Sequence, residues 1–163
     1  MSKYGYQKVT FADPIKETCR CIFGFDDEQL YGTRKEVIDT TWNITPRKAF
    51  QFVGTDLFRN HFGECCPDVG ENIWVTVVRN KIRRELELYP TKKFVISDIR
   101  YQNELDCVKQ LNGSIIKLTR ESSHVDTHAS EMYLDQLVAD YNYDNNRDKK
   151  SMYDYIDRLL SLD

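Results

Sequence analysis

Four groups of charged and polar residues each follow directly on a segment of the 163-residue chain that is typical of a β-strand. These groups are Asp13 with Lys16, Asp98 with Arg100 and Glu104, Arg120 with Glu121, and Asn145 with Asn146 and Arg147. Open parallel sheets bind ligands beyond the carboxyl ends of their strands. Arginine forks match phosphate oxygens, and a hard cation such as Mg²⁺ prefers carboxylate oxygens. The four groups therefore predict a phosphate and magnesium site on one rim of a sheet.

Each group also has a structural interpretation, which the residues alone leave open. Asp13 is followed by a proline and has the pattern of a helix cap. Asp98 and Arg100 can form an ion pair, and Arg120 can be a solvated charge at a strand end. His128 adds a further candidate, because its imidazole can either form a local hydrogen bond or contact a ligand.

Hydrophobic periodicity predicts strands and helices that alternate along the chain. We predict strands at residues 8–11, 94–96, 114–119 and 141–144, and helices at 14–23, from 45 onward, 73–89, 101–111, 130–137 and 151–160. The apolar run 94–96 predicts a strand buried on both faces, and the polar run 26–42 predicts a surface excursion. Together these elements predict a single α/β domain over residues 1–163, a three-layer parallel sheet with helices on both faces.

Local signals predict where two of the helices begin and which face is buried. Asp13 is predicted to be the N-cap of the first helix, with Pro14 at its first position and Gly24 at its end. The helix that begins near Pro46 carries an apolar stripe at three- and four-residue steps: Ala49, Phe50, Val53, Leu57 and Phe58. This stripe is predicted to face the core.

The composition excludes several classes of partner and compartment. The formal net charge is −3, from 23 basic and 26 acidic side chains, so the chain has no overall attraction to nucleic acids or anionic membranes. No stretch approaches the ~20 apolar residues of a membrane span, and the N-terminus lacks the apolar region of a secretory signal. We therefore expect a cytoplasmic protein with no nucleic-acid partner and no membrane partner.

The cysteines and the missing catalytic patterns restrict the chemistry further. Five cysteines, an odd number, favour reduced thiols, although Cys19, Cys21, Cys65 and Cys66 leave a zinc site as an alternative. The 163 residues contain no G-x-S-x-G, H-E-x-x-H or G-x-G-x-x-G pattern, and no Walker A loop. We therefore expect no glycine-rich amide nest for donor phosphates within these residues.

Five short blocks occur in a fixed order: FADPIK at 11–16, GTD at 54–56, IW at 73–74, SDIRYQNE at 97–104 and THASE at 127–131. In this order they resemble the deoxynucleoside monophosphate kinases of phages and large DNA viruses. The match is collinear from about Tyr6 to the C-terminus. The resemblance implies the P-loop nucleoside monophosphate kinase fold, ATP and Mg²⁺ as cofactors, and transfer of the γ-phosphate of ATP to a deoxynucleoside monophosphate (dNMP).

The resemblance also implies roles for individual residues. Asp98 and Arg100 would be the catalytic pair, with Asp98 near the metal and Arg100 on the acceptor phosphate. The substrate-binding residues would be Lys16, Arg47, Asp56, Trp74, Glu104 and His128. Asp56 and Trp74 would line the acceptor pocket, and Arg120, Asn145 and Asn146 would lie on the ATP side.

One part of the family pattern has no counterpart in these residues. Family members begin with a strand, a Gly-rich loop and a helix before the position that corresponds to Tyr6. We therefore expect the sheet to lack its first strand, so that either the sheet closes up or a second copy in a homo-oligomer supplies a strand. Two functions stay open: a phosphotransferase acting on dNMP, or a non-catalytic mononucleotide-binding or protein-interaction module derived from the same fold.

Overall fold

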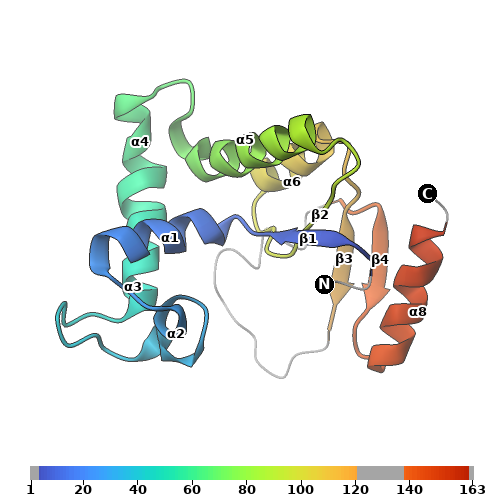
Figure 1. Ribbon diagram of the computed structural model, residues 1–163, viewed down its shortest axis with the longest axis horizontal. Coiled ribbons are helices and arrows are strands. Elements are labelled where there is room, and N and C mark those ends of the chain that lie inside the picture. The colour runs from blue at the N-terminus through green and yellow to red at the C-terminus, as the bar shows by residue number, and fades with distance from the viewer. Residues whose placement is uncertain (1–3, 121–137, 162–163) are drawn as a thin grey trace. The chain divides into compact units, whose positions relative to one another are not determined.

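The computed structural model of the chain describes residues 4–120 and 138–161 (Figure 1). These residues form two compact units, which divide between residues 1–99 and residues 100–163. We describe each unit by itself. The single domain predicted from the sequence stays a prediction.

Unit 1 contains two strands and most of the helices. In chain order its elements are β1 (Tyr6–Val9), α1 (Ala12–Phe23), α2 (Asp27–Leu30), η1 (Thr33–Glu36), α3 (Pro46–Gln51), η2 (Phe52–Arg59), α4 (Asn60–Cys65), η3 (Gly70–Asn72), α5 (Ile73–Leu88) and β2 (Lys93–Ile96). β1 and β2 are parallel neighbours, in a register that runs from Tyr6 opposite Lys93 to Val9 opposite Ile96. The carboxyl ends of the two strands therefore lie side by side.

Helix α1 begins at Ala12, two residues earlier than the sequence predicts, and Asp13 does not cap it. Its N-cap residue is Phe11, which has no capping side chain of its own, so the prediction that Asp13 caps this helix is wrong. Instead, the Asp13 amide donates to Thr10 Oγ1 at 3.0 Å. The predicted end is confirmed: Gly24 adopts φ 71°, a left-handed conformation that glycine reaches without strain, and its amide donates to the Arg20 carbonyl.

The long helical run after Pro46 changes type in the middle. Thr45 caps α3, whose helical path continues through the π-helical segment η2 into α4. A π-helix bonds i to i+5 rather than i to i+4, so it turns later residues away from the face that an α-helical period predicts. Ala49 and Val53 are buried as predicted, and Phe50 and Phe58 pack against the same core. Leu57 is 42% exposed, so the stripe prediction is wrong at that position, which lies inside the π segment.

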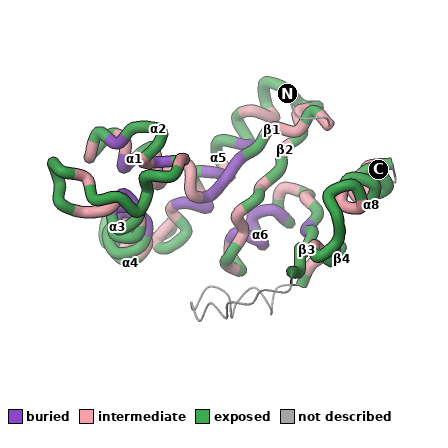
Figure 2. Tube along the Cα trace, turned by 90° about the horizontal axis from the view of Figure 1, so that it is seen from below, coloured by how far each residue is buried: buried purple, intermediate pink, exposed green. Residues whose placement is uncertain are grey.

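The core of unit 1 forms where α1, the segment after it and the 46–59 helical run meet α5. Its buried residues are Cys19, Phe25, Leu30, Ala49, Val53 and Trp74. Figure 2 shows the buried positions of α5, which are Trp74, Val75, Val78 and Ile82, whereas Cys19 is the buried residue of α1. A close approach between two of these helices depends on Gly54, because an added Cβ there would lie 2.9 Å from Ile15 Cδ1. The polar excursion at residues 26–42 is more ordered than predicted, since it contains α2 and η1.

Unit 2 is a smaller arrangement of helices on a strand pair. Its described elements are α6 (Gln102–Gln110), β3 (Ile116–Thr119), β4 (Tyr141–Asp144) and α8 (Lys149–Leu160). β3 and β4 are parallel, with Ile116 opposite Tyr141 and Thr119 opposite Asp144. The Tyr143 ring packs against Tyr155 of α8 with a centroid distance of 4.9 Å.

The fold class is mixed α/β, as predicted, and the described strands pair in parallel. The described strands form two separate pairs rather than one sheet. The burial predicted for β2 is wrong for the described residues, because Val95 is 46% exposed. The helix predicted at 130–137 lies outside the described residues. None of the helices in residues 4–120 and 138–161 combines the length and apolar character that a membrane crossing needs.

Candidate functional site

The carboxyl ends of β1 and β2 bring the first predicted group together with part of the second. Asp98, directly beyond β2, accepts the Phe11 amide on Oδ1 and the Ala12 amide on Oδ2, both at 3.0 Å. These amides belong to the start of α1, where a helix leaves its first N–H groups without internal partners. The carboxylate therefore joins the end of one strand to the helix that follows the other.

Lys16 lies one helical turn further along α1 and is partly buried among charges of both signs. Its Nζ lies 4.4 Å from the centroid of the Tyr31 ring. Burial lowers the pKa of Lys16, and the nearby Lys35 and Lys8 also lower it, whereas Asp13 and Asp98 act in the opposite direction. Partial burial and like charges both disfavour the ammonium form, and an anion placed beside Lys16 would offset that cost.

Asp13 is the carboxylate at this rim that the described residues leave without a hydrogen bond or ion pair. Its charge raises the pKa of Lys16, which places it within electrostatic reach of the ammonium. The described residues contain no group of three or more side chains suited to hold a metal ion. Mg²⁺ usually takes one or two carboxylates together with phosphates and water, so a single carboxylate beside a phosphate fits it.

Arg100 begins unit 2 with a fixed backbone and an exposed side chain. Glu104, which is 4% exposed, accepts the Arg100 amide at 2.8 Å and the Tyr101 amide at 3.2 Å, both on Oε2. This is the return bond of a capping box, in which the third helical residue closes the helix start. Within the described part of the chain, the Arg100 guanidinium has no ion pair. It is therefore available to an anionic ligand.

We expect Glu104→Ala to lower the free energy of unfolding by about 1–3 kcal/mol, because two partly buried amides lose a charged acceptor. Urea unfolding measures this loss. Asp106→Asn is the matched control, since it removes an exposed carboxylate from the same helix and should change stability by less than about 0.5 kcal/mol. Equal losses in the two variants would contradict a structural role for Glu104.

The predicted ATP-side residues lie together at the carboxyl end of the β3–β4 pair. Arg120 follows β3 and is exposed, while Asn145 and Asn146 follow β4. The Asn145 amide donates to the Thr119 carbonyl at 2.7 Å, which continues the parallel pairing past the strands. Asn146 turns back on Asp144, to which both its backbone and its side-chain N–H groups donate. These three residues therefore share one strand end within unit 2, and a rim common to all four predicted groups stays a prediction.

The remaining substrate-binding predictions fall in different places. Arg47 forms an ion pair with Glu36 on the surface of unit 1. Asp56 lies in the π-helical segment and lines an open hollow of about 440 Å³ with Phe23 and Phe52. Trp74 is 4% exposed, so its ring faces lie in the core rather than at a surface. His128 lies outside the described residues.

Trp74 is held by a specific hydrogen bond as well as by packing. Its Nε1 donates to the Gly54 carbonyl at 2.7 Å, and its ring meets Phe58 edge-on at 5.3 Å. We expect Trp74→Phe to lower the free energy of unfolding by about 1–3 kcal/mol, because the buried carbonyl loses its donor. Chemical unfolding tests this, and dNMP titration of the folded variant separates core from ligand roles. A large loss of dNMP affinity at unchanged stability would instead favour base stacking.

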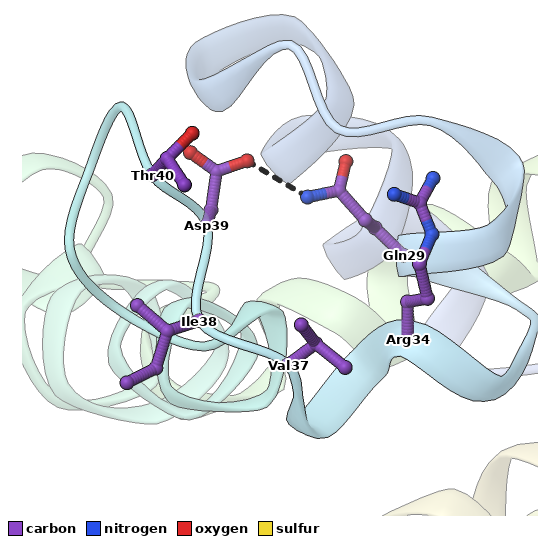
Figure 3. A pocket seen from close by; sticks show the side chains of 6 residues that line it. All are labelled: Gln29, Arg34, Val37, Ile38, Asp39 and Thr40. Carbon is purple, nitrogen blue, oxygen red and sulfur yellow. Dashed lines mark hydrogen bonds between the residues drawn. The ribbon is translucent and has the colours of Figure 1, made fainter.

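A second hollow lies in the excursion that the sequence marked only as surface. It has a volume of about 250 Å³ and is lined by Gln29, Arg34, Val37, Ile38, Asp39 and Thr40 (Figure 3). Gln29 Nε2 donates to Asp39 Oδ2 at 2.8 Å across it, and Arg34 is paired with Asp26. Because Arg34 is paired with Asp26 and Asp39 already accepts from Gln29, we assign the hollow no chemistry.

Sequence reasoning missed three residues around Lys16. Tyr31 contacts its ammonium, and Lys8 and Lys35 add positive charge near it. Tyr31 and Lys35 come from the excursion at 26–42, whose irregular pattern gave no signal that it returns to α1. The Tyr31 hydroxyl donates to Glu17 Oε1 at 2.7 Å, which ties the ring to the same helix as Lys16.

Comparisons with known proteins give a consistent result over nearly the whole chain. The family model described as deoxynucleotide monophosphate kinase matches residues 1–156. A protein of Acanthamoeba polyphaga mimivirus, provisionally named deoxynucleotide monophosphate kinase, is 38% identical over 164 aligned residues, which cover 96% of this chain and 83% of that protein. No solved structure matches the chain.

Proposed function

Because the chain belongs to the deoxynucleotide monophosphate kinase family, we propose that it acts in transfer of the γ-phosphate of ATP to a dNMP. The family supplies the reaction, and the described residues supply candidates for the groups that bind the acceptor. Phosphoryl transfer depends mainly on positioning and on neutralising charge around the moving phosphoryl group. The position in which each side chain holds its charge therefore decides its role.

Arg100 is the residue that carries the proposal. A buried carboxylate fixes its backbone through two amide hydrogen bonds, and its guanidinium has no ion pair among the described residues. The other candidate arginine of the acceptor side, Arg47, is already paired with Glu36. An arginine fork can bind two phosphate oxygens at once, so we assign Arg100 to the acceptor phosphate.

Lys16 is proposed as a second cationic contact of the acceptor phosphate. Its ammonium is partly buried against Tyr31, beside further positive charge from Lys8 and Lys35. We propose Asp13 as the carboxylate that would hold Mg²⁺, because the described residues leave its oxygens unpaired. Bound Mg²⁺ would neutralise phosphate charge there. Asp56 is proposed to line the acceptor pocket from its open hollow.

For the residues on the ATP side, the supporting observation is their shared position at one strand end. Arg120, Asn145 and Asn146 share the carboxyl end of a parallel strand pair, which is where open sheets bind ligands. We propose that they contact ATP. The 163 residues contain no Walker A pattern, so the described residues do not fit the amide nest that holds donor phosphates in P-loop proteins. We therefore derive no step through that nest.

We also propose the finer fold that the sequence predicts, a three-layer parallel sheet. Both strand pairs are parallel, and purely parallel sheets are normally covered on both faces. Val95 and Leu118 expose apolar side chains from these strands, at 46% and 56%. Such surface supports the view that further elements cover or extend the strands. A second copy that supplies a strand stays a prediction.

Two measurements on the full chain test the proposed function. A coupled assay with ATP, Mg²⁺ and each of dTMP, dGMP, dCMP and dAMP should detect formation of the nucleoside diphosphate. Calorimetry should detect dNMP binding without ATP, and ATP binding in a separate titration. If dNMP binds but ATP does not, the chain is a binding module and the kinase proposal is wrong. If neither binds, the acceptor assignment is wrong as well.

A further inference from the structure

Asp98 makes an unusual connection for a carboxylate predicted to contact a metal. Both of its oxygens are engaged by backbone amides of residues 86 and 87 positions earlier in the chain, Ala12 and Phe11. These are the first amides of α1, and the N-cap residue Phe11 offers no capping side chain. The carboxylate thus replaces the missing cap, and its charge lies at the positive end of the helix dipole.

The same helix carries the charged groups of the unit 1 rim. Lys16 and Asp13 both lie in its first turns, and Asp98 fixes where those turns begin. The parallel register sets Val9 opposite Ile96, so the short links to α1 and to Asp98 leave neighbouring strand ends. Any shift of α1 along β2 would break both Asp98 bonds and move Lys16.

We infer that Asp98 is a positioning residue, which acts through α1 to hold Lys16 at the acceptor phosphate rather than by touching substrate or cation. This inference rests on the proposed function for its kinetic consequences, but not for its structural ones. The competing role makes Asp98 a ligand of Mg²⁺, in which case its effect should not depend on α1. The two roles separate in variants that disturb the helix start with and without removing the carboxylate.

Asp98→Asn and Thr10→Ala form the test pair. Asn keeps the size of Asp but can accept only one of the two amides, while Thr10→Ala removes the other cap of α1, the bond from the Asp13 amide. Loss of a helix cap weakens the folding equilibrium roughly two- to thirtyfold. We expect both variants to raise KM for the dNMP, by at most that factor, because apparent affinity falls with the fraction of chains whose helix start is formed. KM for ATP and the Mg²⁺ requirement should stay unchanged.

Two results would overturn the inference. A raised Mg²⁺ requirement in Asp98→Asn, absent in Thr10→Ala, would show that the carboxylate contacts the cation. Unchanged KM for the dNMP in both variants, at reduced stability, would show a merely structural cap. Asp98→Glu is a third variant, and partial recovery of the dNMP KM in it supports positioning.

Hydrogen exchange separates failure of this inference from failure of the proposed function. If the unmodified chain binds no dNMP, the function is wrong, yet the Phe11 and Ala12 amides still report on Asp98. Faster exchange of both amides in Asp98→Asn supports the connection to α1. Unchanged exchange contradicts it, whatever the enzyme activity.

Discussion

Arg100→Ala is expected to reduce kcat/KM for the dNMP by about 10- to 150-fold. Hydrogen bonds to charged groups contribute about 1.5–3 kcal/mol, and each 1.4 kcal/mol corresponds to a factor of ten. The loss should be in dNMP binding, because Glu104 fixes the Arg100 backbone through its amide and that bond survives the substitution. Steady-state kinetics with the dNMP varied at saturating ATP measures it, and calorimetry with the dNMP alone provides an activity-independent value.

Two further variants distinguish a specific contact of Arg100 from a general effect of positive charge. Arg100→Lys keeps the charge but loses the planar fork, so it should recover only part of the affinity. Arg83→Ala removes one positive charge from the exposed side of α5 and should leave the dNMP KM unchanged. If Arg83→Ala weakens dNMP binding as much as Arg100→Ala does, the effect is one of net charge and Arg100 has no assigned contact.

The parts of the fold that sequence predicts well are those with local causes. The bounds of β4, Tyr141–Asp144, are those predicted, because alternating aromatic residues end in a polar turn. Gly24 ends α1 for the reason expected, a positive φ that favours glycine. Hydrogen bonds between distant residues follow no such local rule. The Asp98 bonds to the start of α1 made the Asp13 capping prediction wrong, since the local pattern gave no sign of a cap from β2.

The π-helical segment shows a second limit of periodicity. A period of 3.6 residues cannot reveal an i to i+5 turn, so the stripe wrongly included Leu57, while Val53 and Phe58 of the same segment face the core. The same change of turn affects which side chains share a face with Asp56, which lines a hollow with Phe52. Gly54 of the π-helical segment packs closely against Ile15 of α1, and this contact is visible only in the tertiary structure.

For the site, the sequence predicted which strand ends carry polar residues but not what each side chain does. Strand register brings Asp98 to the start of α1 in unit 1 and Asn145 to the end of β3 in unit 2, and one rim shared by all four polar groups stays a prediction. The roles of Glu104 and Trp74 depend on burial, which composition does not give. Both side chains form hydrogen bonds with backbone groups inside their own unit. Membership of a family motif therefore does not by itself make a polar or aromatic residue a ligand contact.

Lys16→Met is expected to reduce kcat/KM for the dNMP by about 10- to 150-fold at neutral pH, through loss of a charged hydrogen-bond donor. In the unmodified chain the lowered pKa of Lys16 makes dNMP binding depend on pH in a range where an ordinary lysine stays charged. Burial is the main cause of that shift, and the ammonium is therefore lost at a pH below the usual 10.5. The dNMP KM should accordingly rise as the pH passes the lowered pKa.

As the pH rises, deprotonation of Lys16 weakens dNMP binding but stabilises the folded chain. Between the lowered pKa of the folded chain and 10.5, the unfolded chain binds more protons at Lys16, so this group makes the free energy of unfolding rise with pH. Lys16→Arg remains charged across that window, so it should keep a flat dNMP KM and lose this contribution to stability. Lys81→Arg, on the exposed side of α5, should change neither profile. If the dNMP KM of Lys16→Arg still rises with pH as in the unmodified chain, another group titrates, and Lys16 is not the cation that binds the acceptor phosphate.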